Sequence, residues 1–286
     1  MGKRISQLAE ITTVDSNDLL NVVDVSDTTY SASGTNKRVT KANLLKEYDI
    51  FSGWIPAEET WTYASADAPT FTFTISGDKT SKYSVGMKIK LTQTTVKYFI
   101  VTAISYSSPN TTVTVYGGTD YTLANATITN PYYSTQKAPQ GFPLSPAKWR
   151  IYKLITSAYT RNSPTSNTWY NVGGSSTQIN LPIGSWDVYY KACVVSVASA
   201  IRTLTYASTL STAGNTNALP EFQCTAYNQK VDVFMADTFF ARGNITITSK
   251  ATYYLNLRAI CDIAITSLTL DATNTPAVIS ATCAYL

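Results

Sequence analysis

The sequence predicts a mainly β protein, and three observations carry that prediction. Of 286 residues, 44 are Thr, 28 are Ser and 20 are Tyr, and Thr and Tyr favour the pleated surface of a strand. Strong helix formers are scarce, with Glu at only five positions. Apolar and polar residues alternate in several segments, which is the period of a strand with one buried face. The length predicts two or three compact units.

Residues 1–50 form the first predicted unit and contain the only expected helix. The apolar run 18–25 suits a short strand, and residues 37–40 suit a returning strand. Thr40 is expected to cap a short helix that runs through Glu47. Such a small piece has no core of its own. We therefore expect it to dock on another surface through its apolar side chains, Leu19, Leu20, Val22, Val23, Leu44 and Leu45.

Residues 51–149 form the second predicted unit, a small β-barrel or sandwich. Two segments alternate clearly and predict half-buried strands. Their apolar members are Phe71, Phe73 and Ile75 in the first segment and Met87, Ile89 and Leu91 in the second. Residues 96–104 and 112–116 continue the series, and the proline-rich stretch 131–146 ends it.

Residues 150–175 are expected to be a linker that holds one further strand or lies extended, and residues 176–286 form the third unit. Two long strands there have clear inward faces. The first places Trp186, Val188, Tyr190, Ala192 and Val194 on one face, and the second places Tyr253, Leu255, Leu257, Ala259 and Cys261 on one face.

The final strand, residues 277–286, carries no charge on either face. An uncharged strand of this kind is expected to be covered on both sides, by the opposite sheet and by a neighbouring subunit. We therefore predict an oligomer. The candidate interface residues are Val278, Ile279, Ala281, Cys283, Ala284, Tyr285 and Leu286.

The chain has no histidine, which excludes Ser-His-Asp and Cys-His nucleophile pairs and histidine-ligated metals. Glycoside hydrolysis needs only two carboxylates, but Asp187 falls on the outward face of a strand and Asp271 lies in a turn-like segment. Gly77-Asp-Lys-Thr is a turn and not a phosphate loop. The four cysteines form no CxxC pair and are expected to be reduced. We predict no enzyme activity, no cofactor and no metal.

The net charge of +4 is spread along the chain, without the basic stripe that nucleic-acid binding needs. The longest nearly apolar run, residues 192–201, is too short to span a bilayer. No apolar run typical of a secretory signal follows the N-terminus. We therefore expect no nucleic-acid partner, no membrane insertion, and synthesis in a cytoplasm.

Adjacent tyrosines must face opposite ways in a strand. This places one tyrosine of each of two pairs outside, and the candidates for an exposed aromatic surface are Tyr189 and Tyr254. Such rings suit subunit packing or stacking on a sugar, and packing is the favoured interpretation.

Lys3-Arg-Ile-Ser-Gln-Leu opens the sequence, and residues 18–24 and 37–45 follow it. Together they resemble the N-terminal attachment segments of fibre-like and minor structural proteins of tailed bacteriophages. Gly53-Trp-Ile-Pro, residues 61–66, Tyr98-Phe and Pro139-Gln-Gly-Phe-Pro look like a β-domain that recurs in such proteins. The segment from Leu181-Pro-Ile-Gly-Ser-Trp to Ser280-Ala-Thr-Cys-Ala-Tyr-Leu is similar to the jelly-roll heads of phage fibres.

The resemblance implies a non-enzymatic virion protein on the particle surface. Residues 1–50 would attach to the capsid, portal or tail, and the jelly roll would form a homotrimer and face the host surface, with a host glycan as a further partner. The chain lacks the heptads and repeats of a long shaft, so a short spike, head fibre or capsid decoration is as consistent as a tail fibre. The alternative is a carbohydrate-binding or polysaccharide-depolymerising module carried on the virion.

Overall fold

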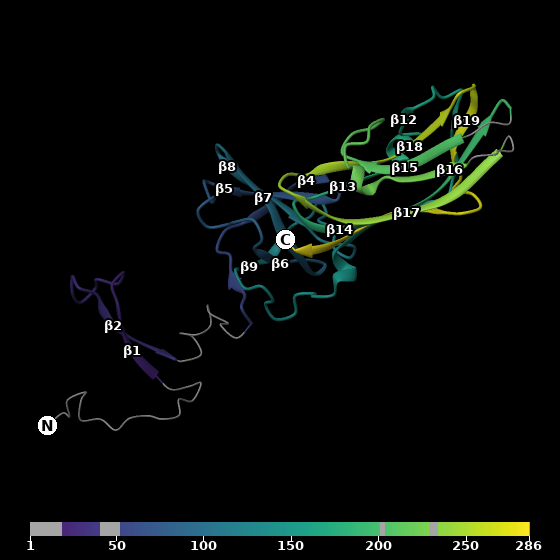
Figure 1. Ribbon diagram of the computed structural model, residues 1–286. Coiled ribbons are helices and arrows are strands. Elements are labelled where there is room, and N and C mark those ends of the chain that lie inside the picture. Colours follow the sequence, from purple (N-terminus) through teal and green to yellow (C-terminus); the bar gives the residue numbers. More distant parts are fainter. Residues whose placement is uncertain (1–18, 41–51, 201–203, 229–233, 286) are drawn as a thin grey trace.

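A computed structural model describes residues 19–40, 52–200, 204–228 and 234–285 (Figure 1). The predicted mainly β fold is confirmed, because these residues form antiparallel sheets joined by turns and three short 3-10 helices. The 3-10 helices are η2 (Pro146–Trp149), η3 (Gly174–Thr177) and η4 (Pro220–Phe222). The helix expected after Thr40, with Leu44 and Leu45, lies outside the described residues.

The two strands predicted in the first unit are present. β1 (Leu19–Asp24) pairs with β2 (Thr35–Thr40), and Figure 1 draws this hairpin in purple. Asp24 and Asp27 order the connection, since Asp24 Oδ1 accepts a hydrogen bond from the Ser26 amide at 3.1 Å and Asp27 forms an ion pair with Lys37 at 2.6 Å. These aspartates therefore act as turn-forming side chains.

The middle unit is one curled sheet of seven strands in the order β3-β9-β6-β7-β8-β5-β4. Its edge strands β3 and β4 do not pair with each other, so the sheet is a half-barrel rather than a closed barrel. The strands are β3 (Ile55–Pro56), β4 (Trp61–Asp67), β5 (Thr70–Ser76), β6 (Lys88–Gln93), β7 (Thr95–Ser107), β8 (Asn110–Tyr116) and β9 (Thr129–Ser134).

The predicted alternation in β5 and β6 holds. Phe73, Ile75, Ile89 and Leu91 are all buried, while Phe71 and Met87 are half-buried at the border of the same core. Trp61 on the edge strand β4 stacks on Phe73 with ring centroids 4.6 Å apart. Large rings from the edges thus help to fill the inside of the half-barrel.

The C-terminal unit is a sandwich of two antiparallel sheets. In the first, the β14 sheet, β14 (Gly184–Ala198) pairs on one side with β17 (Phe234–Ile247). On its other side it pairs with β19 (Ile265–Leu270) and β20 (Ala277–Tyr285), whose outer edges carry β11 (Tyr159–Asn162) and β10 (Arg150–Ile155). In the second, the β18 sheet, β18 (Ala251–Cys261) pairs with β15 (Leu204–Ser211), which pairs with β16 (Cys224–Asn228). The other edge of β18 carries β12 (Thr168–Tyr170) and β13 (Gln178–Leu181).

The strand order of this sandwich is that of a jelly roll. Three pairs of consecutive strands each act as one interrupted strand of the jelly roll: β10 with β11, β12 with β13, and β19 with β20. The strands of the sandwich, numbered along the chain, then occupy eight positions. The β14 sheet then contains the first, eighth, third and sixth positions, and the β18 sheet the second, seventh, fourth and fifth. Two Greek keys wound together produce this order.

Residues 150–175, expected to be a linker, instead supply β10, β11 and β12 to the two sheets. β10 is a true alternating strand, with Ile151 and Ile155 inward. β11 and β12 have only four and three residues. Ser163 and Asn167 have positive φ values between them, and strands this short carry little periodic signal.

The inward faces predicted for β14 and β18 are confirmed. The five predicted β14 side chains are completely buried, and those of β18 are at most 8% exposed. The Tyr190 hydroxyl lies in this core within 3.1 Å of the Ser208 carbonyl and 2.8 Å of the Phe222 carbonyl. This buried hydroxyl is thus satisfied by hydrogen bonds.

The half-barrel and the jelly roll share one continuous core. The buried cluster of the sandwich extends to Trp54, Ile100 and Tyr116 of the middle unit. The Tyr116 ring lies 5.9 Å from that of Trp186 on β14, and Lys250 forms an ion pair with Asp67 at 2.6 Å. The two units therefore pack against each other directly, as Figure 1 shows.

Candidate subunit interface

The outer face of the β14 sheet is the surface opposite the sandwich core. Because β14 buries every second side chain inward, Asp187, Tyr189 and Lys191 point outward. The strand register places a neighbour from each adjoining strand beside them, since paired residues of antiparallel strands share a face. The three resulting rows are Leu154–Val278–Lys191–Phe240, Tyr152–Ser280–Tyr189–Arg242 and Arg150–Thr282–Asp187–Asn244.

Large apolar side chains on this face are exposed. Phe240 on β17 is 58% exposed, and Leu154 and Tyr152 on β10 are 51% and 46% exposed. β17 and β10 are the two edges of this part of the sheet, with β14 and β20 between them. Exposed apolar groups gathered on one face mark an interaction surface, and aromatic side chains are typical anchors of such surfaces.

Charged groups lie among the apolar residues, with Lys191 between Val278 and Phe240. The Arg242 guanidinium donates hydrogen bonds to both carboxylate oxygens of Asp187 across β14 and β17, which holds the pKa of that carboxyl below its usual range. The Arg150 guanidinium lies 4.7 Å from the centre of the Tyr152 ring. The face therefore has apolar side chains at its two edges, with charged and polar groups between and beside them.

The residues predicted for the interface divide between the two faces of β20. Val278 lies on the outer face but is only 8% exposed, and Ala284 is exposed beside a register irregularity. Ile279 and Ala281 are completely buried in the sandwich core and are not available to a partner. Cys283 is half-buried. Nothing is described of the Tyr285 side chain, and Leu286 lies outside the described residues.

Tyr152, Leu154 and Phe240 were not predicted as interface residues from the sequence. Tyr152 and Leu154 lie in the expected linker, where the alternation of residues 150–155 could have indicated a strand with one outward face. Phe240 follows Phe239, so alternation alone leaves open which ring faces inward. The structure packs Phe239 against Tyr206, with ring centroids 5.8 Å apart, and leaves Phe240 outside.

The remaining predicted surface residues lie apart. Tyr189 is half-buried on the outer face of the β14 sheet, and Tyr254 is half-buried on the β18 sheet beside Gly214, so the structure does not bring them together. In the N-terminal hairpin, Val22 and Val23 are 36% and 56% exposed. The side chains of Leu19 and Leu20 are among those of which nothing is described.

Asp187 and Asp271, which were considered for catalysis, and Asp78 of the Gly77-Asp-Lys-Thr turn take part in local structure. Asp187 is paired with Arg242. Asp271 accepts a hydrogen bond from the Thr273 amide at 3.1 Å, and Asp78 accepts one from the Thr80 amide at 3.0 Å. Both are side chains that order their own turns.

The described part of the chain contains no group of three or more metal-ligating side chains. None of its helices is long and apolar enough to cross a membrane.

No protein-family model matches the chain, and no curated protein matches it. Among solved structures, this chain is similar to a chain in the structure of infectious bursal disease virus strain Gx, with 13% sequence identity and a TM-score of 0.30. The match covers 90% of this chain and 68% of that chain. The structure of the VP2 subviral particle of the same virus matches with 10% sequence identity and a TM-score of 0.28, and the match covers 83% of this chain and 81% of that chain. The structure of dimeric latent PorU from Porphyromonas gingivalis matches with 8% sequence identity and a TM-score of 0.26, and the match covers 80% of this chain and 24% of that chain. TM-scores this low do not establish a shared fold.

Proposed function

We propose that the protein is a non-enzymatic structural component of a tailed-bacteriophage virion and that it works as a homotrimer on the particle surface. The observation that carries the trimer is the outer face of the β14 sheet, with Phe240, Leu154 and Tyr152 each about half exposed. The sequence resemblance to phage fibre heads supports both the virion location and the number of subunits. Covering these rings in an assembly removes apolar surface from water.

The arrangement of the apolar side chains suits a ring of subunits. In a cyclic trimer, each contact joins one patch of a subunit to a different patch of the next. Phe240 lies on β17 at one edge of the face, and Leu154 and Tyr152 lie on β10 at the other. Contact between the β17 edge of one subunit and the β10 edge of the next would cover all three side chains in every subunit.

Attachment to the particle is the role we propose for residues 1–50. The exposed Val22 and Val23 on β1 offer an apolar contact to a capsid, portal or tail protein. The test is a chain lacking residues 1–50, supplied during infection in place of the full chain. We expect a folded trimer that is missing from purified particles, and incorporation at the level of the full chain would contradict this role.

Binding to a host-surface glycan is a second candidate function, favoured by a hollow on the jelly roll of about 550 Å³. Trp169, Tyr170, Arg161, Asn171 and Asn215 line it. Aromatic rings that stack on sugar faces, combined with amide and guanidinium hydrogen-bonding groups, suit a saccharide. The described residues that line it include no Asp or Glu, so this hollow suits binding and not the hydrolysis of a polysaccharide.

The glycan role is tested on an array of host polysaccharides. Trp169→Ala is expected to abolish binding, whereas Tyr227→Ala, which removes a 76% exposed ring on another strand, is expected to preserve it. An absence of binding by the unaltered trimer would contradict this role and leave the structural role intact.

A further inference from the structure

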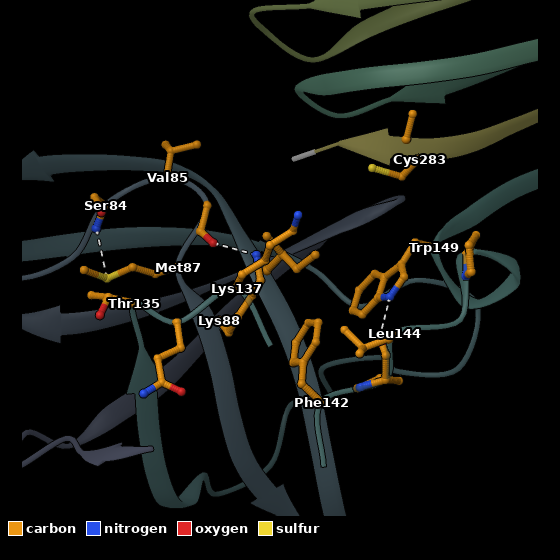
Figure 2. Close-up of a pocket in the computed structure, with 16 residues that line it drawn as sticks. Ser84, Val85, Met87, Lys88, Thr135, Lys137, Phe142, Leu144, Trp149 and Cys283 are labelled. Atoms are coloured by element: carbon orange, nitrogen blue, oxygen red, sulfur yellow. Dashed lines mark hydrogen bonds between the residues drawn. The ribbon is translucent and has the colours of Figure 1, made fainter. Parts of the chain in front are cut away.

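A groove of about 680 Å³ lies where the half-barrel meets the end of the jelly roll (Figure 2). One wall comes from the turn before β6, with Val85, and from the first residue of β6, Lys88. A second comes from residues 135–146, and Cys283 and Ala284 of β20 close it on the jelly-roll side. Its volume falls within the range of small-molecule sites in proteins, roughly 300–1,000 Å³.

One part of the groove is apolar and aromatic. Phe142 and Trp149 stack with ring centroids 5.2 Å apart and planes only 8° from parallel. The Trp149 indole N–H donates to the Pro143 carbonyl at 2.8 Å. Both rings are mostly packed in the core, with Trp149 6% and Phe142 7% exposed, so each presents only a small apolar area to the groove. Leu144 and Val85 at the rim are 65% and 49% exposed. An apolar ligand body has a matching surface here.

The other part of the groove is cationic. The half-buried Lys88 extends along Phe142, with its ammonium 5.8 Å from the ring centre, and the exposed Lys137 lines the same groove. Lys88 donates one hydrogen bond, to the Gly86 carbonyl at 2.8 Å, out of the three that an ammonium can donate. The sixteen described residues that line the groove include no aspartate or glutamate.

Among the described residues that line the groove, no carboxylate supplies the counter-ion that a partly buried charge ordinarily has. Burial lowers the pKa of Lys88, the nearby Cys283 thiol raises it and the charge of Lys137 lowers it, and the lowering effects prevail. An anion placed in the groove would accept the remaining hydrogen bonds of Lys88 and offset the repulsion between the two lysines.

We propose that this groove binds a small amphipathic carboxylate, whose carboxylate accepts hydrogen bonds from Lys88 and whose apolar body lies against Phe142 and Trp149. The inference goes beyond the proposed virion role and does not depend on it. The positive charges of Lys88 and Lys137 favour an anionic ligand. The aromatic residues Phe142 and Trp149 favour a ligand with an apolar body over a small hydrated anion.

The test is isothermal titration of the full-length protein with three probes. Octanoate has both the carboxylate and the apolar body, 1-octanol has only the body, and acetate only the carboxylate. We expect octanoate to bind at least tenfold more tightly than either of the others, because a hydrogen bond to a charged group and the burial of several methylenes each contribute at this scale.

Variants at Lys88 decide whether the groove is responsible. Lys88→Met keeps an apolar stem and removes the charge, and we expect it to reduce octanoate affinity to that of octanol, while Lys88→Arg retains most of the affinity. The matched control is Lys153→Met, because Lys153 also donates to a single carbonyl, Ser175, at 2.9 Å but lies outside the groove.

Equal affinity for octanoate and octanol, or octanoate affinity unchanged by Lys88→Met, would overturn the proposal. If Lys88→Met fails to fold, Leu144→Asp at the exposed rim tests the same groove. It places a negative charge on the apolar wall and is expected to weaken octanoate binding at least tenfold, and an unchanged affinity would likewise overturn the proposal.

Discussion

Replacing Phe240 by alanine tests the proposed interface at its most exposed ring. Phe240 is 58% exposed in the single subunit, so full covering removes about 115 Å² of its surface from water if a whole Phe side chain has roughly 200 Å². At about 25 cal/mol per Å² this corresponds to about 3 kcal/mol, of which truncation to alanine loses about 2 kcal/mol. Each interface then weakens about 30-fold, and the association constant of a ring with three interfaces falls by about 10⁴.

Sedimentation equilibrium over a range of protein concentrations measures this change directly. We expect Phe240→Ala to shift the trimer–monomer midpoint to higher concentration while the free energy of unfolding of the subunit changes by less than about 0.5 kcal/mol, because the ring is exposed there. The matched control is Tyr227→Ala, which removes a 76% exposed ring from β16 of the opposite sheet. A Phe240→Ala midpoint equal to that of the control would refute the interface.

Three further predictions concern stability. Tyr190→Phe is expected to lower the free energy of unfolding by about 1–2 kcal/mol in urea titrations, because it leaves the buried Phe222 carbonyl without the hydroxyl at 2.8 Å; an unchanged value would contradict this. Burial raises the pKa of Glu59, but hydrogen bonds from Lys82 at 2.9 Å to both carboxylate oxygens outweigh it and hold the pKa below its usual 4.5. Glu59 therefore contributes stability above about pH 4.5 that is lost as the pH falls. We expect the Tm of Glu59→Gln to drop less between pH 5 and pH 3 than the Tm of the unaltered chain. An equal drop in the two proteins would count against this role of Glu59. Because the core runs through Tyr116 and Trp186, calorimetry should show the half-barrel and jelly roll unfolding in one transition, and two resolved transitions would contradict a shared core.

The inward faces of the long strands could be predicted from sequence. Strict alternation identified the buried side chains of β14 and β18, because a strand of eleven or more residues repeats its period several times. β11 and β12 have too few residues to show a period. Their place in the sandwich is set by pairing with β19 and β18, which is long-range information.

The subunit interface on β20 stays a prediction, and the sequence named its residues without separating the two faces of the strand. The absence of charge on β20 indicated a covered strand, yet it did not distinguish the face that packs in the core, with Ile279, from the face that points outward, with Val278. The exposed side chains that complete the surface lie on β10 and β17. They join Val278 only through the register of four strands, which no local pattern specifies.

The mass of the unaltered protein in solution tests the central claim most directly. Light scattering coupled to size exclusion, at micromolar concentration, is expected to return three times the chain mass of 31.2 kDa, about 94 kDa. A mass of one chain across that concentration range would contradict the trimer and remove the β14 sheet as a subunit interface.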